Sequence, residues 1–345
     1  MRYAMKKVFV TGATGFIGAC LARELLELGC RVKVLVRRGS NRKNLSGMDV
    51  ELSEGDLCDT ESLARGITGC DTLFHVAADY RLWTRDPSSM YAVNVGGTRA
   101  VLEAALQKDV SRVVYTSSVG TLGNRGDGTP GTEDTPVSFS DMVGHYKKSK
   151  FLAEREAETF IERGLPLVIV NPSTPVGPYD IKPTPTGKII VDVLNRKMPA
   201  YLDTGLNLID VEDCAKGHIL AALHGRIGQK YILGNENLTL RDIFALLADI
   251  SGRPAPRVKL PYTPILIAAY VNEGIARLTG REPLIPLAGV QMAKKHMFFD
   301  SAKAVRELGL PRRPVRHALE RAVEWFCSEG YAPWETSHPP APVNP

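Results

Sequence analysis

Residues 11–18, with the sequence TGATGFIG, constrain the fold of this chain more than any other stretch. They follow an apolar run at residues 8–10 that is typical of a strand, and they lead into a helical pattern. Gly12 permits a sharp turn, Gly15 a close backbone approach to a pyrophosphate, and Gly18 close helix–strand packing. The helix N-terminus then offers free N–H groups to phosphates. A purely structural turn is the alternative, but the context favours dinucleotide binding by Gly12, Thr14, Gly15, Phe16, Ile17 and Gly18.

Apolar β-like runs alternate with helical patterns through the first half of the chain. We expect strands at residues 7–10, 31–36, 50–53, 72–75, 112–116 and 167–170, and helices at 16–28, 60–65, 90–107 and 145–163. Strands separated by helices form βαβ units. The predicted fold class is therefore α/β, a doubly wound parallel Rossmann sheet with a smaller, mostly helical C-terminal lobe that binds the substrate.

Turn residues and prolines cluster after residue 171, which suggests a domain boundary. We place an NAD(P)-binding Rossmann domain at 1–178 and a substrate-binding lobe at 179–330, some segments of which rejoin the sheet. The proline-rich tail at 331–345 is expected to be disordered. The apolar helix expected at 264–278 is predicted to lie in the core of the lobe, with docking of a lipid or a membrane surface as the alternative.

The composition excludes several classes of protein. The 345 residues carry a formal net charge of +5 without a run of five like charges, which argues against nucleic acid binding. The six cysteines show neither a CxxC pair nor the spacing of a metal site. The sequence contains no signal-peptide pattern and no apolar stretch long enough to span a membrane. We expect a cytoplasmic protein without a metal and with at most peripheral membrane contact.

Arg37 follows the second expected strand, 19 residues after Gly18. NAD-binding folds place an acidic residue there for the ribose hydroxyls, whereas a guanidinium suits a 2′-phosphate. The sequence therefore predicts a preference for NADP(H), with NAD(H) possible, and a solvated basic loop is the alternative. Asp56, followed by Leu57, comes just after the third strand, where its carboxylate can reach the adenine amino group.

Tyr146 and Lys150 are four residues apart and therefore share one face of a helix. A nearby ammonium is expected to lower the pKa of the phenol from about 10. Tyr146 would then exchange a proton with the substrate, while Lys150 hydrogen-bonds the nicotinamide ribose. Ser118 ends the fifth strand, where its hydroxyl can orient the substrate oxygen. The order of glycine turn, serine, tyrosine and lysine argues against chance.

These motifs resemble those of the extended short-chain dehydrogenase/reductase family, the NAD-dependent epimerases and dehydratases. The matching stretches lie between residues 8 and 178 and include 55–57, 75–78, 94–98, 116–118 and 171–178. The resemblance implies that the catalytic set is Ser118, Tyr146 and Lys150. It also implies cofactor contacts from Ala77, Ala78, Asn94, Pro172 and Ser173, and a homodimer formed by the helices at 90–107 and 145–163.

Residues 75–83, 171–175, 180–187 and 292–295 are similar to the hopanoid-associated sugar epimerase subgroup, which is related to dihydroflavonol 4-reductases and aldehyde reductases. This resemblance implies hydride transfer at a carbonyl or secondary alcohol of a sugar- or polyol-like, hopanoid-linked substrate. Arg37 favours NADPH-dependent net reduction, and sugar epimerisation in hopanoid biosynthesis is the alternative. A non-catalytic cofactor-binding sensor is a remote third reading, which the intact Ser118, Tyr146 and Lys150 oppose.

Three further residues are candidates for the substrate site. Tyr80 and Trp83 follow the fourth strand and can wall an apolar or sugar-binding pocket, with local packing as the alternative. Lys182 lies in a proline-rich stretch that can bind substrate or serve only as a connector.

Overall fold

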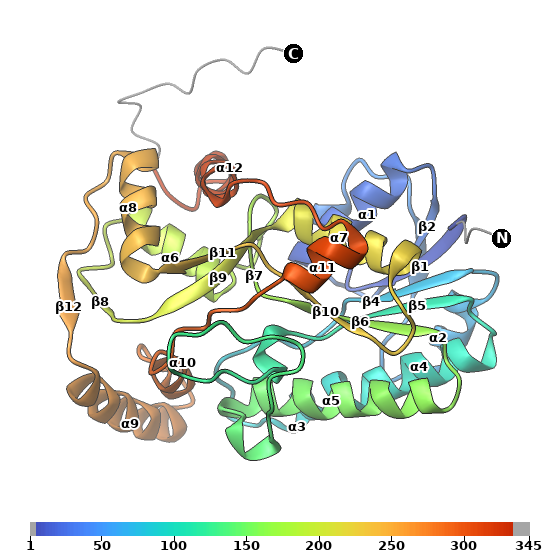
Figure 1. Ribbon diagram of the computed structural model, residues 1–345, viewed down its shortest axis with the longest axis horizontal. Coiled ribbons are helices and arrows are strands. Elements are labelled where there is room, and N and C mark those ends of the chain that lie inside the picture. The colour runs from blue at the N-terminus through green and yellow to red at the C-terminus, as the bar shows by residue number, and fades with distance from the viewer. Residues whose placement is uncertain (1–4, 334–345) are drawn as a thin grey trace, which may run out of the picture.

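The computed structural model describes residues 5–333. Its central sheet consists of parallel strands in the order β10-β6-β5-β4-β1-β2-β3 (Figure 1). Their bounds are β1 (Lys7–Thr11), β2 (Arg31–Val36), β3 (Glu51–Glu54), β4 (Thr72–His75), β5 (Arg112–Thr116), β6 (Leu167–Pro172) and β10 (Lys230–Leu233). The order reverses between β1 and β4, and ligands of such sheets bind at the reversal. The predicted doubly wound Rossmann fold is confirmed.

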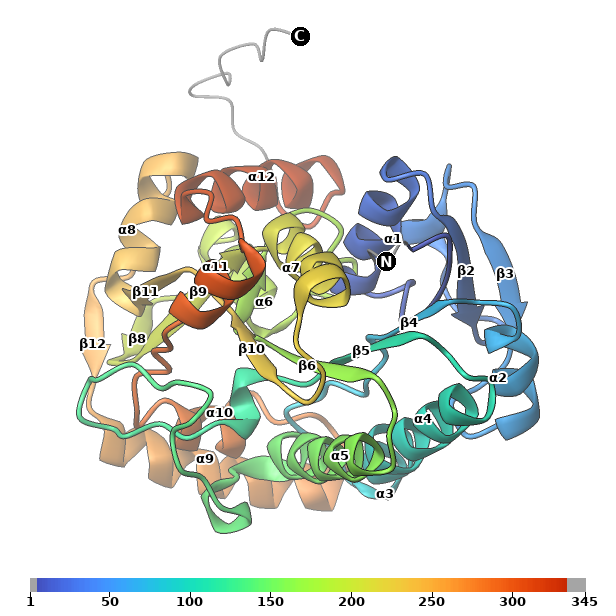
Figure 2. The same ribbon diagram turned by 45° about the vertical axis from the view of Figure 1, so that its right-hand side comes forward.

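Helices cover both faces of this sheet (Figure 2). One face carries α1 (Phe16–Glu27), α7 (Val211–His224) and α11 (Ala302–Leu308), and the other carries α2 (Thr60–Ile67), α4 (Thr98–Gln107) and α5 (Gly144–Glu162). Val8 and Val10 pack on the α1 side, whereas Phe9 packs on the α5 side. Because side chains alternate along a strand, a strand covered on both faces is apolar throughout.

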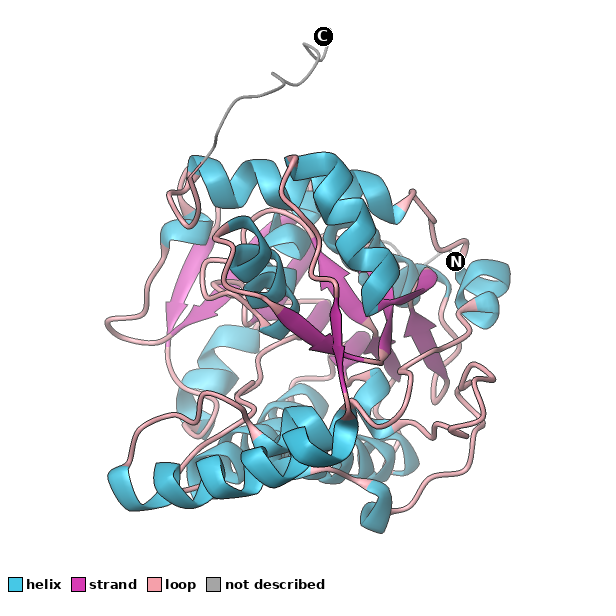
Figure 3. Ribbon diagram, turned by 90° about the vertical axis from the view of Figure 1, so that its left-hand side faces the viewer, coloured by secondary structure: helices cyan, strands magenta, loops and turns pink. Residues whose placement is uncertain are grey.

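The C-terminal lobe has its own core beside the carboxyl ends of the central strands. It contains α6 (Pro185–Leu194), α8 (Leu240–Ser251) and α12 (Val315–Ser328), packed around Ile190, Phe244 and Phe326. Two small sheets complete it: β7 (Thr174–Val176) with β9 (Gly205–Asp210) and β11 (Glu236–Thr239), and β8 (Ala200–Leu202) with β12 (Val258–Leu260). The helices α9 (Tyr262–Thr279) and α10 (Leu287–Met292) pack on each other. Figure 3 shows the strands enclosed between helical layers.

The structure differs from the expected elements in two kinds of place. The short strands β7, β8, β11 and β12 were not predicted, because three or four residues carry too little pattern. The single helix expected at residues 90–107 is instead α3 (Ser88–Tyr91), a π-helical segment at Ala92–Gly97 and then α4. One segment of the lobe placed at 179–330 does return to the central sheet, since β10 pairs with β6.

The predicted disordered tail begins at Tyr331, and most of it lies outside the described residues. Tyr331 itself is placed: its ring stacks on Trp325 with 5.6 Å between centroids, and its hydroxyl donates to the carbonyl of Ile181 at 2.7 Å. The aromatic contact and the hydrogen bond explain why order extends past residue 330.

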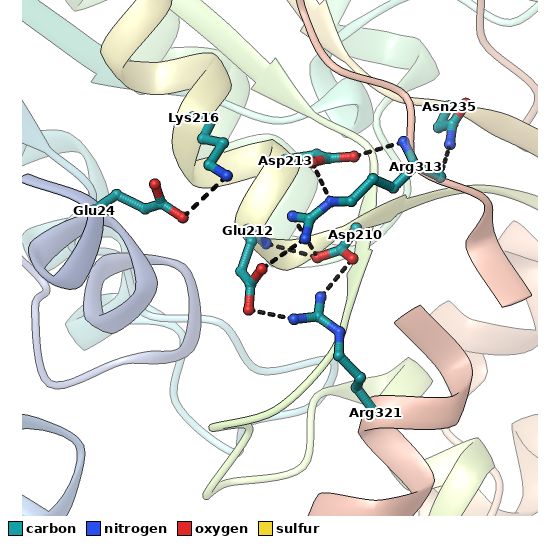
Figure 4. Close-up of polar contacts among 8 residues, drawn as sticks. All are labelled: Glu24, Asp210, Glu212, Asp213, Lys216, Asn235, Arg313 and Arg321. Atoms are coloured by element: carbon teal, nitrogen blue, oxygen red, sulfur yellow. Dashed lines mark hydrogen bonds and ion pairs between the residues drawn. The ribbon is translucent and has the colours of Figure 1, made fainter. Parts of the chain in front are cut away.

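A cluster of charged side chains fastens α12 and the segment before it to the start of α7 (Figure 4). Arg313 Nε donates to Asp213 Oδ1 at 2.7 Å, and Arg313 Nη1 donates to Glu212 at 2.8 Å. Arg321 bridges Glu212 and the buried Asp210. Buried charges are stable only when they are paired, so this cluster holds the lobe and the Rossmann sheet together.

Candidate active site

The glycine turn between β1 and α1 has the geometry of a phosphate-binding loop. Gly12 has φ +79°, and a Cβ added there would lie 2.6 Å from the backbone nitrogen of Ala77. A Cβ at Gly18 would lie 2.2 Å from the carbonyl oxygen of Gly12. Helix α1 begins at Phe16, and its N-cap residue is Gly15, which has no side chain to cap the helix. The first-turn N–H groups therefore stay available to a pyrophosphate.

The loop after β4 lies directly against this turn. Ala77 donates its N–H to Thr11 Oγ1 at 3.3 Å, and Thr11 Oγ1 hydrogen-bonds His75 Nδ1 at 2.8 Å. His75 is buried, and burial lowers its pKa to about 3. The neutral imidazole therefore links β1 to β4. Ala77 and Ala78 lie at the switch point of the sheet, as a cofactor contact requires.

Asn94 does more than was predicted for it. Its Oδ1 accepts from the backbone of Asp79 at 2.7 Å, and its Nδ2 donates to the Asp79 carbonyl at 3.0 Å and to Ser149 Oγ at 2.9 Å. Asn94 thus clamps the loop after β4 to helix α5. It lies in the π-helical segment at Ala92–Gly97, a kind of irregularity that often marks functional sites.

Arg37 is exposed at the carboxyl end of β2. The neighbouring strand β3 pairs Glu54 with Val36, so a carboxylate ends its strand beside this position, which the sequence order alone did not indicate. Asp56 follows on the same edge, and its Oδ1 accepts from the backbone of Cys58 at 2.9 Å. Leu57 is buried, and a Cβ at Gly97 would lie 2.9 Å from its Cβ. Leu57 therefore packs the loop in place.

Pro172 and Ser173 lie at the end of β6. Pro172 is in register with Leu233, and Ser173 donates its N–H to the Leu233 carbonyl at 2.9 Å. The Ser173 hydroxyl is buried and has no hydrogen-bond partner among residues 5–333. Buried polar atoms nearly always have a partner. This hydroxyl therefore fits a polar group of a ligand bound at the carboxyl end of the sheet.

The predicted catalytic hydroxyls meet between β5 and α5. Tyr146 lies in the first turn of α5, and its hydroxyl hydrogen-bonds the hydroxyl of Ser118. Ser118 Oγ also accepts from the backbone of Gly120 at 3.0 Å. The ring of Tyr80 lies 4.4 Å from the ring of Tyr146, measured between centroids. Tyr80, Ser118 and Tyr146 are thus brought together, from three separate segments of the chain.

The pKa of Tyr146 moves opposite to the expected direction. Burial, with Tyr80 beside it, raises the pKa of the phenol well above its ordinary value, and the Ser118 hydrogen bond only partly offsets this. Lys150 does not offset this effect, because its Nζ donates instead to the Thr116 carbonyl at 2.7 Å and to the Tyr115 hydroxyl at 3.2 Å. Burial in turn lowers the pKa of Lys150 to about 8. The phenol is therefore in its protonated form at neutral pH.

Glu154, which we did not single out from the sequence, holds together the segments around Ser118 and Tyr146. It is buried one turn after Lys150, and its Oε2 accepts from Thr121 Oγ1 at 2.7 Å and from Asn171 Nδ2 at 3.1 Å. Ser117 also donates to it, and its Oε1 pairs with Lys230. One carboxylate thus joins the segments that carry Ser118 and Ser173. The spacing of Tyr146, Lys150 and Glu154, four residues each, was the available signal.

Lys147 is a second residue that the sequence reasoning missed. Its stem passes Gly120, where an added Cβ would lie 3.4 Å from Lys147 Cγ and 3.2 Å from Ser118 Oγ. Its ammonium donates to Met297 Sδ at 3.8 Å, and burial, together with the Lys295 charge, lowers its pKa to about 8. A thioether is a weak acceptor. The Lys147 ammonium therefore has a weak acceptor, and the stem of the side chain passes the segment that carries Ser118.

The three candidate substrate residues have different environments. Tyr80 faces Tyr146 and is 45% exposed. Trp83 donates Nε1 to Glu273 Oε1 of α9 at 3.2 Å, so it anchors a helix of the lobe. Lys182 is exposed, and no described contact joins it to Tyr146. Its neighbour Asp180 is buried instead and accepts from the Thr184 backbone at 2.8 Å.

Within residues 5–333, no group of three or more His, Cys, Asp or Glu side chains is arranged to hold a metal ion. Over the same residues, no helix has both the length and the apolar character needed to cross a bilayer.

Comparison with known proteins agrees with this geometry. The NAD dependent epimerase/dehydratase family matches residues 8–234. A putative dihydroflavonol 4-reductase from Synechocystis is 48% identical over 94% of this chain and 95% of the relative. Sterol demethylase protein B from Methylococcus capsulatus is 32% identical over 93% of this chain and 98% of that protein. Among solved structures, gox2253 is 49% identical, with a TM-score of 0.86 over 95% of this chain and 99% of that one.

Proposed function

Because the chain belongs to the NAD dependent epimerase/dehydratase family, we propose that it catalyses net reduction of a carbonyl by NADPH. The substrate is a sugar- or polyol-like compound, and the product is the corresponding alcohol. The family assignment makes the chain an NAD(P)-dependent enzyme. The direction of the reaction, the preference for NADPH and the substrate class are the proposal.

The residues that would hold the dinucleotide lie along the carboxyl edge of the central sheet, near the point where the strand order reverses. Gly12, Gly15 and Gly18 receive the pyrophosphate at the start of α1, Arg37 receives the 2′-phosphate, and Asp56 receives the adenine. The buried hydroxyl of Ser173 is placed for the nicotinamide end. When bound, NADPH supplies the hydride. The protein supplies the orientation, the polar contacts and the proton.

Tyr146 is the proposed proton donor, and this assignment carries the preference for reduction. Reduction of a carbonyl requires a proton at the carbonyl oxygen, and burial keeps the Tyr146 phenol protonated. Ser118, which hydrogen-bonds Tyr146, would donate to the same oxygen as negative charge develops on it. Lys150, anchored on Thr116 and Tyr115, would hydrogen-bond the ribose and replace the proton that Tyr146 gives up.

Arg37 is the single observation that supports NADPH over NADH. A bidentate guanidinium–phosphate pair contributes about 1.5–3 kcal/mol, or about 10–100-fold in affinity. We expect Arg37→Ser to weaken NADPH binding by that factor, measured by fluorescence titration, and to leave NADH binding unchanged. Arg38→Ser is the matched control. Equal losses for both cofactors, or tighter NADH than NADPH binding by the wild type, would contradict the preference.

Sugar epimerisation is the second candidate, and the family description itself favours it. An epimerase oxidises and reduces the same carbon, so the bound cofactor is not consumed. Purified protein incubated with NADPH, and in parallel with NADP⁺, and a panel of aldoses and their alkyl derivatives separates the two. Stoichiometric loss of NADPH supports the reductase, whereas a stereochemical change without loss of NADPH supports the epimerase. A non-catalytic sensor would bind NADPH and do neither.

The substrate class rests on weaker support. The relative from Methylococcus is named for work on sterols, which are polycyclic and apolar. Tyr80 offers an aromatic wall beside Tyr146, as sugar and polycyclic ligands both favour. We propose a sugar or polyol linked to a hopanoid. A competition assay, in which a polyol and its hopanoid-linked form are offered to the enzyme together, tests whether the lipid is part of the substrate.

We further propose a homodimer through α4 and α5. These neighbouring helices cover one face of the central sheet, and Arg99 of α4 forms an ion pair with Glu156 of α5. Light scattering on the purified chain measures the mass directly, and a monomer would contradict the proposal.

A further inference from the structure

Helix α9 presents an apolar stripe to solvent instead of burying it. The stripe consists of Pro264, Ile267, Ala268, Val271, Ile275 and Leu278, which lie on one side of the helix within an arc of about 100°. The four large members, Ile267, Val271, Ile275 and Leu278, are between 52% and 87% exposed. Of the helix's residues, only Ala269 and Ala276 are buried. The expectation that this helix lies in the core of the lobe is therefore wrong.

Two polar side chains of α9, Glu273 and Asn272, contact the rest of the protein instead. Glu273 accepts from Trp83 Nε1 and from Arg277 Nε, both at 3.2 Å. Asn272 Oδ1 accepts from the backbone of Ile285 at 3.1 Å. A surface helix of a globular protein ordinarily has the reverse orientation, with its apolar side inward. An exposed apolar patch with polar edges marks a surface that docks on something else.

The charged side chains around the stripe indicate the kind of surface on which it docks. Residues 257–284 contain four basic side chains, Arg257, Lys259, Arg277 and Arg281, against two acidic ones, Glu273 and Glu282. Lys259 pairs with Asp203 at 2.7 Å and Arg277 pairs with Glu273 at 3.2 Å, which leaves Arg257 and Arg281 for an external anion. Arg85 adds a further cation at the C-terminal end of the helix, since a Cβ at Gly280 would lie 3.4 Å from its Nη1. Leu284, 91% exposed, extends the apolar surface there.

We propose that α9 docks on an anionic lipid bilayer, with the stripe in the interface and the arginines at the headgroups. An apolar helix face edged by arginines has the composition of an interfacial helix. Arginine stems cover apolar surface while the guanidinium reaches the polar layer, where anionic lipids attract it. Docking on a soluble partner protein would not require basic side chains at the edge of an uncharged apolar surface.

Helix α9 borders the active site through its inward side, opposite the stripe. Trp83, which bonds α9, is three residues from Tyr80, and Tyr80 packs on Tyr146. On the other side, a Cβ at Gly144 would lie 3.1 Å from Ala288 of α10, which packs against α9. The docking proposal goes beyond the reductase proposal and does not depend on it.

Vesicle sedimentation tests the docking directly. The full chain is mixed with vesicles of phosphatidylcholine alone and of phosphatidylcholine with phosphatidylglycerol. We expect binding to the anionic vesicles, stronger than to the neutral ones and weakened by salt. The double variant Val271→Asp with Leu278→Asp should bind at least about tenfold more weakly. Ile227→Asp, at an exposed apolar residue in the turn before β10 of the central sheet, is the control and should bind as the wild type does.

Two further readouts make the outcome decisive. NADPH titration should give the same affinity for the double variant and the wild type, which shows that the fold is intact and keeps the test separate from the reductase proposal. Light scattering without vesicles should give the same mass for both. Wild-type protein that ignores anionic vesicles, or a double variant that binds them equally well, would overturn the proposal. A mass that falls only in the double variant would assign the stripe to a second copy of the chain and would overturn it as well.

Discussion

Glu154→Gln is the change that tests how the site is held together. The substitution keeps the shape of the side chain but removes the buried charge that accepts from Ser117, Thr121 and Asn171 and pairs with Lys230. Hydrogen bonds to a charged group contribute about 1.5–3 kcal/mol each, and an amide retains part of them. Lys230 keeps Glu158 as a partner, at 2.8 Å. We therefore expect a loss of about 3 kcal/mol in the free energy of unfolding.

The assay is urea unfolding of the wild type and the variant at neutral pH, followed by steady-state kinetics on the folded fraction. Because Ser117 precedes Ser118, and Asn171 lies two residues before Ser173, we also expect kcat to fall about tenfold, with a smaller change in KM for NADPH. Glu158→Gln is the matched control. Glu158 is on the same helix and shares Lys230, but it is partly exposed, so its loss should cost less than about 1 kcal/mol. Equal effects of the two variants would refute the reasoning.

Three further predictions concern the turn, the buried acid and the ion cluster. Gly12→Ala should destabilise the fold by at least about 2 kcal/mol and weaken dinucleotide binding, because its Cβ meets the backbone of Ala77, whereas Gly39→Ala, with a similar φ but open space, should cost about 1 kcal/mol. Burial raises the pKa of Asp180 from 3.8 to about 6, so the stability that its protonated form contributes is complete below pH 3.8 and is lost as pH rises through 6. Between pH 4 and pH 8, the free energy of unfolding of the wild type should therefore fall by about 3 kcal/mol relative to that of Asp180→Asn in unfolding titrations. Arg313→Met should cost about 3–5 kcal/mol in urea unfolding, since it leaves the buried Asp213 unpaired, and a loss no greater than that of the exposed Arg316→Met would contradict the account.

The central sheet could be predicted because its strands are apolar on both faces and the glycine turn has a fixed relation to the strand before it and the helix after it. Val8, Phe9 and Val10 pack on opposite helical layers, as a continuous apolar run indicates. The meeting of Ser118 with Tyr146 followed from the topology, which brings strand ends and the start of α5 to one edge.

Other features depend on contacts that no local pattern encodes. Lys150 points at Thr116 and Tyr115, so the expected fall in the pKa of Tyr146 was wrong: spacing places two side chains on one face but does not fix which groups each one reaches. The charge on Glu154 is satisfied by three distant segments, and only the fold assembles them. The apolar residues of α9 predicted burial because periodicity cannot tell which way a helix faces.

Transfer of deuterium from C4-labelled NADPH to the carbonyl carbon of an aldose or polyol-derived aldehyde tests the central claim most directly. The account predicts that the wild type places the label on the new carbinol carbon in proportion to the NADPH consumed. It predicts that Tyr146→Phe binds NADPH normally but transfers the label at least about 100-fold more slowly, because the proton donor is missing. Full transfer by Tyr146→Phe, or label that never leaves NADPH while the substrate changes its stereochemistry, would contradict it.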